Sequence, residues 1–399
     1  MIKRLLSAIG VFAAVALSGC SLFSPTIHVL DDYVYWEETA DARYNVYING
    51  EKNEQSDNFV TIPTDCDVEL AVETVKNGNT SGKVTVHRQA DPATVTVNDE
   101  ASFGRYVADA GSGAEEEAKP DGQNSADGTV APPDADGPDV PGGEGTYDFR
   151  LLREGYSFDY TAQLPEGVFA VSPEVRLVRI ATGGREICVS FVLEKRTDAF
   201  ILELDNAVLT GADDRPVVYA RSDGNAVTPD VIVRLTGDNR ITGGENTADG
   251  ADGAPAERLT SATLTDGSET SDTLSAMGGA GGDGSDGYAA IVAPDTLFCG
   301  DGTLVVTGGK GSDGGDGGDS APGAEGGHGG DGGRGGAAVD GETLYVNCTD
   351  GAVTLYGGAG GDGGKQGDGF MNMGHDGSRG RSGRGFAGEC IVIDGTLNR

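Results

Sequence analysis

The sequence predicts an all-β protein, in which an N-terminal β-sandwich precedes a right-handed parallel β-helix carrying a Gly-rich bundle of the polyglycine-II type. Short apolar segments separated by turn residues occupy residues 25–88. A strand unit recurs at a constant offset after residue 200. From this unit the chain departs into Gly-Gly-x triplets, the longest at 308–337. A period of three is that of an extended helix with three residues per turn, and fits neither an α-helix nor a strand.

Composition and charge limit the protein class. The 399 residues include 67 glycines and 6% aromatic residues, with a net charge of −36. This length predicts two or three domains, and so few aromatic residues argue against a large globular core. The strong acidity argues against nucleic acid as a partner. It favours divalent cations, basic partners, or solubility alone.

The N-terminus has the pattern of a bacterial lipoprotein signal peptide. Lys3 and Arg4 precede an apolar run at 5–17, which is too short to span a membrane stably. The run ends in the sequence LSGC at 17–20, which resembles the bacterial lipobox. That resemblance implies removal of residues 1–19 and attachment of diacylglycerol, with palmitate-type chains, to Cys20. The mature protein is then expected on the extracytoplasmic membrane surface of the cell envelope. The alternative is an ordinary signal peptide with an incidental cysteine.

Residues 20–106 are expected to form the β-sandwich, with strands at 27–30, 33–36, 44–48, 59–62, 68–75 and 83–87. The segment resembles a fibronectin type III domain in Pro25, Trp36, the pattern AxYxVY at 42–47, and the Asn49-Gly50 turn. The resemblance implies a spacer or partner-binding unit and places Trp36 in the core. An acidic, Pro- and Gly-rich linker is expected at 107–146, because almost nothing there can be buried.

Residues 147–399 are expected to form the β-helix. Residues 297–309 align with 346–358 at one constant offset, 390–397 begins a third copy, and 235–244 is a shorter one. Repeated short strands of this kind predict a solenoid whose coils bury their apolar faces against one another. Cys299 and Cys348 fall at the same point of two aligned units, which predicts either a buried stack or a disulfide. No cysteine spacing indicates a zinc site.

Three Gly-rich excursions interrupt the β-helix, at 243–289, 308–337 and 357–386. The phasing breaks in the middle of the second and third, at residues 320–322 and 370–373, which predicts that these excursions turn back. We expect three hairpins whose six arms pack side by side, because buried backbone polar groups need partners that neighbouring arms can supply. Flexible loops are the alternative, and a collagen triple helix is disfavoured because Pro is scarce.

The C-terminal half resembles a bacterial family of parallel β-helix carbohydrate-binding domains with a pectate-lyase-like fold. The motifs are Asn206-Ala207-Val208, 216–219, LxGDN at 235–239, and 302–309. The resemblance implies glycan binding, since a characterised member binds acidic plant polysaccharide with calcium. The triplet excursions depart from this family, so no ligand residue is carried over from it.

Rows of carboxylates at the third positions of the triplets are candidate calcium ligands, because calcium prefers oxygen ligands. The alternative is a solvated charged face that keeps a glycine bundle soluble. The candidate metal ligands are Asp283, Asp286, Asp313, Asp316, Asp319, Asp331 and Asp362.

Catalytic signatures are scarce. Past residue 200 the only lysines are Lys310 and Lys365, both in the triplets, and His328 and His375 are expected to be isolated surface residues. The sequence therefore predicts a lipid-anchored, non-catalytic surface protein for binding or adhesion, with carbohydrate as ligand and calcium as a candidate cofactor. A structural envelope scaffold or stalk is the alternative, and a polysaccharide lyase the third reading.

Overall fold

The computed structural model describes residues 24–97, 149–152, 155–160, 166–194, 196, 198–212, 214–220, 230–256, 277–321, 324–369 and 373–399. This part of the chain is built from β-strands and extended segments, which confirms the all-β class. The signal peptide, Cys20 and the linker at 107–146 lie outside the described residues. No helix in the described ranges is long and apolar enough to cross a membrane.

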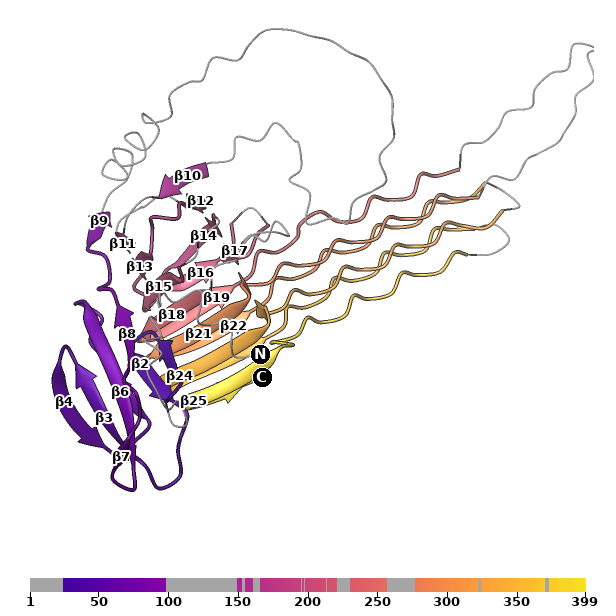
Figure 1. The fold of residues 1–399 in the computed structure, drawn as a ribbon. Helices are drawn as coiled ribbons and strands as arrows, with labels where there is room; N and C mark the ends of the chain where they lie inside the picture. The colour runs from indigo at the N-terminus through magenta and orange to yellow at the C-terminus, as the bar shows by residue number, and fades with distance from the viewer. Residues whose placement is uncertain are drawn as a thin grey trace, which may run out of the picture.

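The N-terminal module is a sandwich of two antiparallel sheets (Figure 1). One sheet has the order β1(Ile27–Leu30), β2(Tyr33–Trp36), β5(Phe59–Thr61). The other contains β4(Glu51–Gln55), β3(Arg43–Ile48), β6(Val68–Lys76) and β7(Asn79–Thr80), with β8(Val84–Arg88) also paired to β6. Alternate side chains from both sheets meet in one core, so Trp36 is fully buried, as predicted.

The turn between β3 and β4 has the sequence Asn49-Gly50, and both residues have positive φ, 49° and 86°. A two-residue turn of this type matches the twist of the strands that it joins. The strand that follows, β4, was not expected from the sequence, because its residues are polar and exposed. An edge strand needs no apolar side, so hydrophobic alternation does not reveal it.

The β-helix consists of three ladders of parallel strands. The first ladder contains β9(Thr94–Val97), β11(Gly155–Asp159), β13(Leu177–Ala181), β15(Phe200–Asp205), β18(Val231–Thr236), β21(Asp295–Gly300), and the first parts of β24(Thr343–Tyr356) and β25(Glu389–Asn398). The second contains the start of β14(Glu186–Leu193), β16(Val208–Thr210), β19(Asp238–Thr242), β22(Thr303–Thr307), and the second parts of β24 and β25. The third contains β10(Phe149–Leu152), β12(Gly167–Val171), the end of β14, β17(Val218–Ala220), β20(Ile291–Val292) and β23(Val339–Asp340).

The ladders enclose one apolar core. Phe158, Phe169, Phe191 and Phe200 form a continuous row inside it, with neighbouring ring centroids 5.8–6.2 Å apart. Each fully buried Phe contributes about 1.5–3 kcal/mol to stability through removal from water. The strand β9 pairs in parallel with β11, so residues 94–97 belong to the β-helix although the sequence placed them with the sandwich.

The expected stack or disulfide of Cys299 and Cys348 is not present, and both cysteines are free. Cys299 pairs with Asn347, while Gly300 pairs with Cys348, so the two cysteines are one residue out of register. Adjacent strand positions face opposite sides, and Cys348 therefore lies in the core while Cys299 lies on the outer surface of the first ladder. The offset of the aligned units changes from 48 residues here to 49 at Leu304, which pairs with Val353.

The Gly-rich excursions form the predicted bundle, because the described parts of all six arms bond to their neighbours. The arms leave the β-helix after β19, β22 and β24 and run side by side away from the N-terminal module (Figure 1). Gly314 donates to Asp362 of the next layer, and Gly315 donates to Gly282 of the layer before. The outward and returning arms of one hairpin are also joined, as Gly330 donates to Gly315. This exchange satisfies backbone groups that an extended helix leaves unpaired.

Candidate functional site

The N-terminal module packs on the outer surface of the first ladder. Leu30 of β1 is 1% exposed and lies in an apolar cluster with side chains from the β-helix. These partners are Leu177, Ala199, Ile201, Ile232, Leu297, Cys299 and Tyr345. Outward-facing apolar side chains on successive coils thus give the module a surface to bind, and the two units meet along this line.

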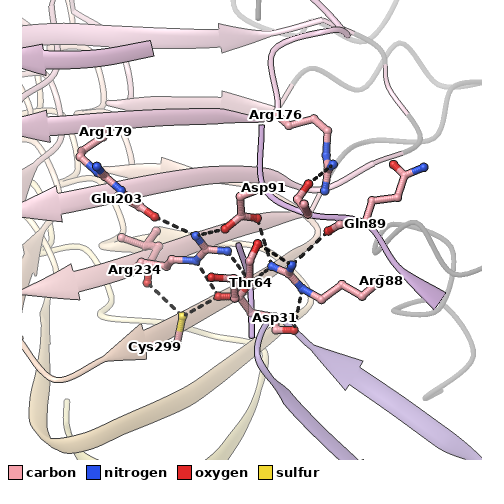
Figure 2. Close-up of polar contacts among 12 residues, drawn as sticks. Asp31, Thr64, Arg88, Gln89, Asp91, Arg176, Arg179, Glu203, Arg234 and Cys299 are labelled. Carbon is pink, nitrogen blue, oxygen red and sulfur yellow. Dashed lines mark hydrogen bonds and ion pairs between the residues drawn. The ribbon is translucent and has the colours of Figure 1, made fainter. Parts of the chain in front are cut away.

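Arg234 of β18 is the centre of an ion-pair network between the module and the β-helix (Figure 2). Its Nε and Nη2 atoms each lie 2.6 Å from a carboxylate oxygen of Asp31, which makes the pair bidentate. Its Nη1 donates to Asp91 at 2.6 Å and to Glu203 at 2.7 Å. Arg88 approaches the same two aspartates of the module, at 3.2 and 3.0 Å. Forked guanidinium–carboxylate geometry fixes orientation as well as charge.

Burial and neighbouring charges shift the pKa values of the groups in and beside this network in different directions. Burial alone would raise the pKa of Asp91, but hydrogen bonds and charge from Arg234 and Arg88 outweigh it and hold that pKa below its usual value. The pKa of Asp32 next to the network is raised, first by burial and then by the charge of Asp31. Burial also raises the pKa of the Cys299 thiol, so this cysteine is not a reactive thiolate.

A cleft of about 620 Å³ opens beside the network, between the module and the β-helix. Its floor is formed by the ends of β15, β18 and β21, and the module supplies one wall. Polar and charged side chains reach it from both units. They are Asp31, Asp32, Thr64, Arg179, Glu203, Asp205, Arg234, Thr236, Asp301 and Thr349.

A second hollow of about 440 Å³ continues this cleft, because Asp32, Gly300 and Thr349 line both. Tyr33 and Phe59 of the module form its aromatic side, with rings stacked 5.5 Å apart at 24°. Phe59 is 43% exposed, so part of its ring is open to solvent. The remaining lining comes from Thr61 of the module and from strand positions of the β-helix, Asn347 on β24 and Ile393 and Asp394 on β25.

The lining of the two hollows combines apolar and polar groups. The half-buried Tyr33 and the exposed Phe59, beside carboxylate, amide and hydroxyl groups, offer a ligand an apolar surface and several hydrogen-bonding groups. The arginines of the cleft are engaged in ion pairs, Arg234 with three carboxylates and Arg179 with Glu203. They are therefore poor candidates for a general base.

The seven aspartates predicted as calcium ligands lie in two columns of arms. For six of them, one carboxylate oxygen accepts a backbone N–H from the next layer of the bundle. These pairs are Asp283 with Asp331, Asp286 with Arg334, Asp313 with Asp362, Asp316 with Lys365, Asp319 with Asp368, and Asp331 with Ser378. The seventh, Asp362, pairs with Arg379 at 3.4 Å. Among the described residues, no three His, Cys, Asp or Glu side chains gather as a metal site, and calcium binding stays a prediction.

His328 and His375 are exposed but not isolated, which differs from the expectation. Their rings are stacked with centroids 5.1 Å apart, and Nδ1 of His328 accepts the N–H of His375. His328 thus accepts a backbone N–H from the next layer, as the aspartates do elsewhere in the bundle. Neither histidine lines the cleft, so neither joins the candidate site.

Sequence reasoning missed the cleft because its residues are distant in the chain. Tyr33 and Phe59 come from the module, whereas Asn347, Thr349 and Asp394 come from the C-terminal end of the β-helix. The signal that was available is Phe59 itself, an apolar residue at an exposed position of a short edge strand.

Comparison with known proteins returned no matching family model, no matching curated protein and no matching solved structure.

Proposed function

We propose that the protein is a lipid-anchored, non-catalytic surface protein that binds carbohydrate in the cleft between its two units. The observation that carries this proposal is the stacked pair Tyr33–Phe59, which lines one hollow together with polar residues of the β-helix. Aromatic rings pack on the apolar faces of sugars, while amide and carboxylate groups bind the hydroxyls. Calcium is a candidate cofactor of this binding.

Two resemblances support the proposal. The strand order β4-β3-β6-β8 beside β1-β2-β5 fits a fibronectin type III-like module, which supplies an interaction surface and no chemistry. The parallel β-helix fits the fold of the bacterial carbohydrate-binding family. Anchoring through Cys20 then places the cleft outside the cell, where polysaccharides are met. Palmitate labelling of wild type and a Cys20→Ala variant tests the anchor, and equal labelling of both would refute it.

A glycan array tests the binding, using the mature chain in calcium and in chelator. We expect Phe59→Ala to lose most of the binding, because the stacking face is removed. Tyr356→Ala is the matched control, since Tyr356 is a 54% exposed aromatic residue outside the cleft. Equal binding by wild type and Phe59→Ala would reject the cleft, and no binding to any glycan would reject the function.

A structural scaffold or stalk is the second candidate, favoured by the hydrogen-bonded bundle. The two functions separate in cells that carry the Phe59→Ala protein. Under the binding proposal these cells lose adhesion to the glycan, and their envelope stays intact. Loss of envelope integrity on deletion of the whole protein, with adhesion unchanged in both strains, would favour the scaffold. Release of unsaturated sugars from polygalacturonate would instead indicate a lyase.

A further inference from the structure

Some charged side chains that line the cleft form ion pairs with other described residues, and others do not. Its two arginines are neutralised within the network, since Arg234 binds Asp31 and Glu203 and Arg179 binds Glu203. Four other carboxylates line the cleft or the second hollow that continues it: Asp32, Asp205, Asp301 and Asp394. None of these four forms an ion pair with a Lys, Arg or His of the described residues. A hollow bordered by low-dielectric protein focuses this negative potential.

The aromatic pair carries a second, independent preference. The faces of Tyr33 and Phe59 bear the negative part of the ring quadrupole and attract cations as well as C–H groups. Asp32 and Asp394 border the same hollow as these rings. A positively charged group on a sugar ring stacked on these faces would be attracted by the carboxylates of the same hollow. A carboxylate group on that sugar would be repelled by them.

We propose that the cleft selects cationic glycans, those whose sugars carry free amino groups, over neutral and acidic ones. This inference rests on the proposed function and narrows its ligand class. It departs from the acidic polysaccharide that the family resemblance implied, because the cleft offers no unpaired cation among its described residues. A sugar is favoured over a basic peptide because Asn347 and Thr349 line the hollow beside the aromatic faces and can bind hydroxyl groups.

Calorimetry on the mature chain tests the inference with three oligosaccharides of equal length: a β-1,4-glucosamine oligomer, its N-acetylated form, and a galacturonate oligomer. We expect the glucosamine oligomer to bind about tenfold more tightly than the N-acetylated one, as two or more exposed ion pairs provide. Added salt is expected to reduce this preference, since exposed charges are screened.

The double variant Asp301→Asn/Asp394→Asn is expected to lose the preference and to keep the binding of the N-acetylated oligomer. Asp340→Asn is the matched control, because Asp340 is an exposed acid on β23 that lines neither hollow. Equal or tighter binding of the N-acetylated or galacturonate oligomer overturns the inference and leaves the proposed function standing. Tighter binding of a lysine oligomer than of glucosamine identifies a basic peptide instead. No binding of any saccharide overturns both.

Discussion

The Oδ1 atom of Asp313 accepts a hydrogen bond of 2.8 Å from the backbone N–H of Asp362 in the neighbouring arm. This hydrogen bond is the main reason why the pKa of Asp313 lies below its usual value. Many glycines of the triplets donate their N–H groups to carbonyls of other arms. The third-position N–H groups of Asp331, Asp362 and Lys365 instead donate to aspartate side chains of the layer before. The aspartates are therefore backbone partners as well as surface charges.

Asp316 tests this role, because it accepts the N–H of Lys365 at 2.7 Å. We expect Asp316→Ala to lower the free energy of unfolding by about 0.5–1.5 kcal/mol, the usual contribution of such a hydrogen bond. Asp316→Asn keeps an acceptor oxygen at the same place and is expected to stay close to wild type. Thermal unfolding in chelator measures both. If Asn is as damaging as Ala, the carboxylate charge matters more than the hydrogen bond.

Glycine is required wherever an arm is enclosed by others. A Cβ at Gly330 would overlap the carbonyl oxygen of Gly282 in the layer before it. We expect Gly330→Ala to separate these arms and to lower the midpoint of thermal unfolding by several degrees, as overpacking of a closed interior costs about 1–3 kcal/mol. Ser378→Ala, at an exposed third position, is the control and is expected to have little effect. Equal midpoints for the two variants would mean that the bundle is loosely packed.

The less regular triplets of the sequence have a structural reason. The first outward arm has alanine at the second position, as at Ala251, and the last returning arm has Asp376, Arg379 and Ser382 where inner arms have glycine. These are the two outermost arms of the bundle, so a side chain there meets no further layer. The period of three thus predicted the hairpins and the bundle. The irregular triplets of the two outermost arms did not reveal that these arms lie at the edges of the bundle.

Other features were not predictable, for definite reasons. A single additional residue in β24 changes the register between Cys299 and Leu304, and no pattern in one sequence marks it. The contact of Arg234 with Asp31 joins residues 203 positions apart. Polar contacts of this kind have no periodicity, so the sequence predicted both units but neither their docking nor the cleft between them.

Arg234 is expected to be essential for that docking. Its side chain is 15% exposed, and its removal leaves Asp31, which is 4% exposed, without its bidentate partner. Asp31 keeps Arg88 as a partner at 3.2 Å, so we expect the loss of Arg234 to cost less than the about 3–5 kcal/mol of a buried charge left wholly uncompensated. Arg179→Ala is the control, since its side chain is 51% exposed and its ion pair contributes about 0–1 kcal/mol. Urea unfolding compares them, and equal losses of stability would contradict a special role for Arg234.

Asp230 gives the protein a pH-dependent stability. It is 7% exposed, its Oδ2 has no hydrogen-bond partner in the described part of the chain, and burial together with the charge of Asp295 raises its pKa to about 8. A carboxyl whose folded pKa exceeds its unfolded value near 3.9 stabilises the fold fully below that unfolded value. This stability declines as the pH rises towards the folded pKa. We therefore expect stability to fall by about 2–5 kcal/mol between pH 4 and 8 on account of this group.

Asp230→Asn isolates this contribution, because the amide has the same shape and no charge to bury. The difference in unfolding free energy between the variant and wild type is expected to grow in favour of the variant as the pH rises from 4 to 8. Asp340→Asn, at an exposed position, is expected to show a constant difference over the same range. Chemical unfolding at a series of pH values measures both. A difference that stays flat for Asp230→Asn would show that Asp230 titrates as an ordinary carboxyl group.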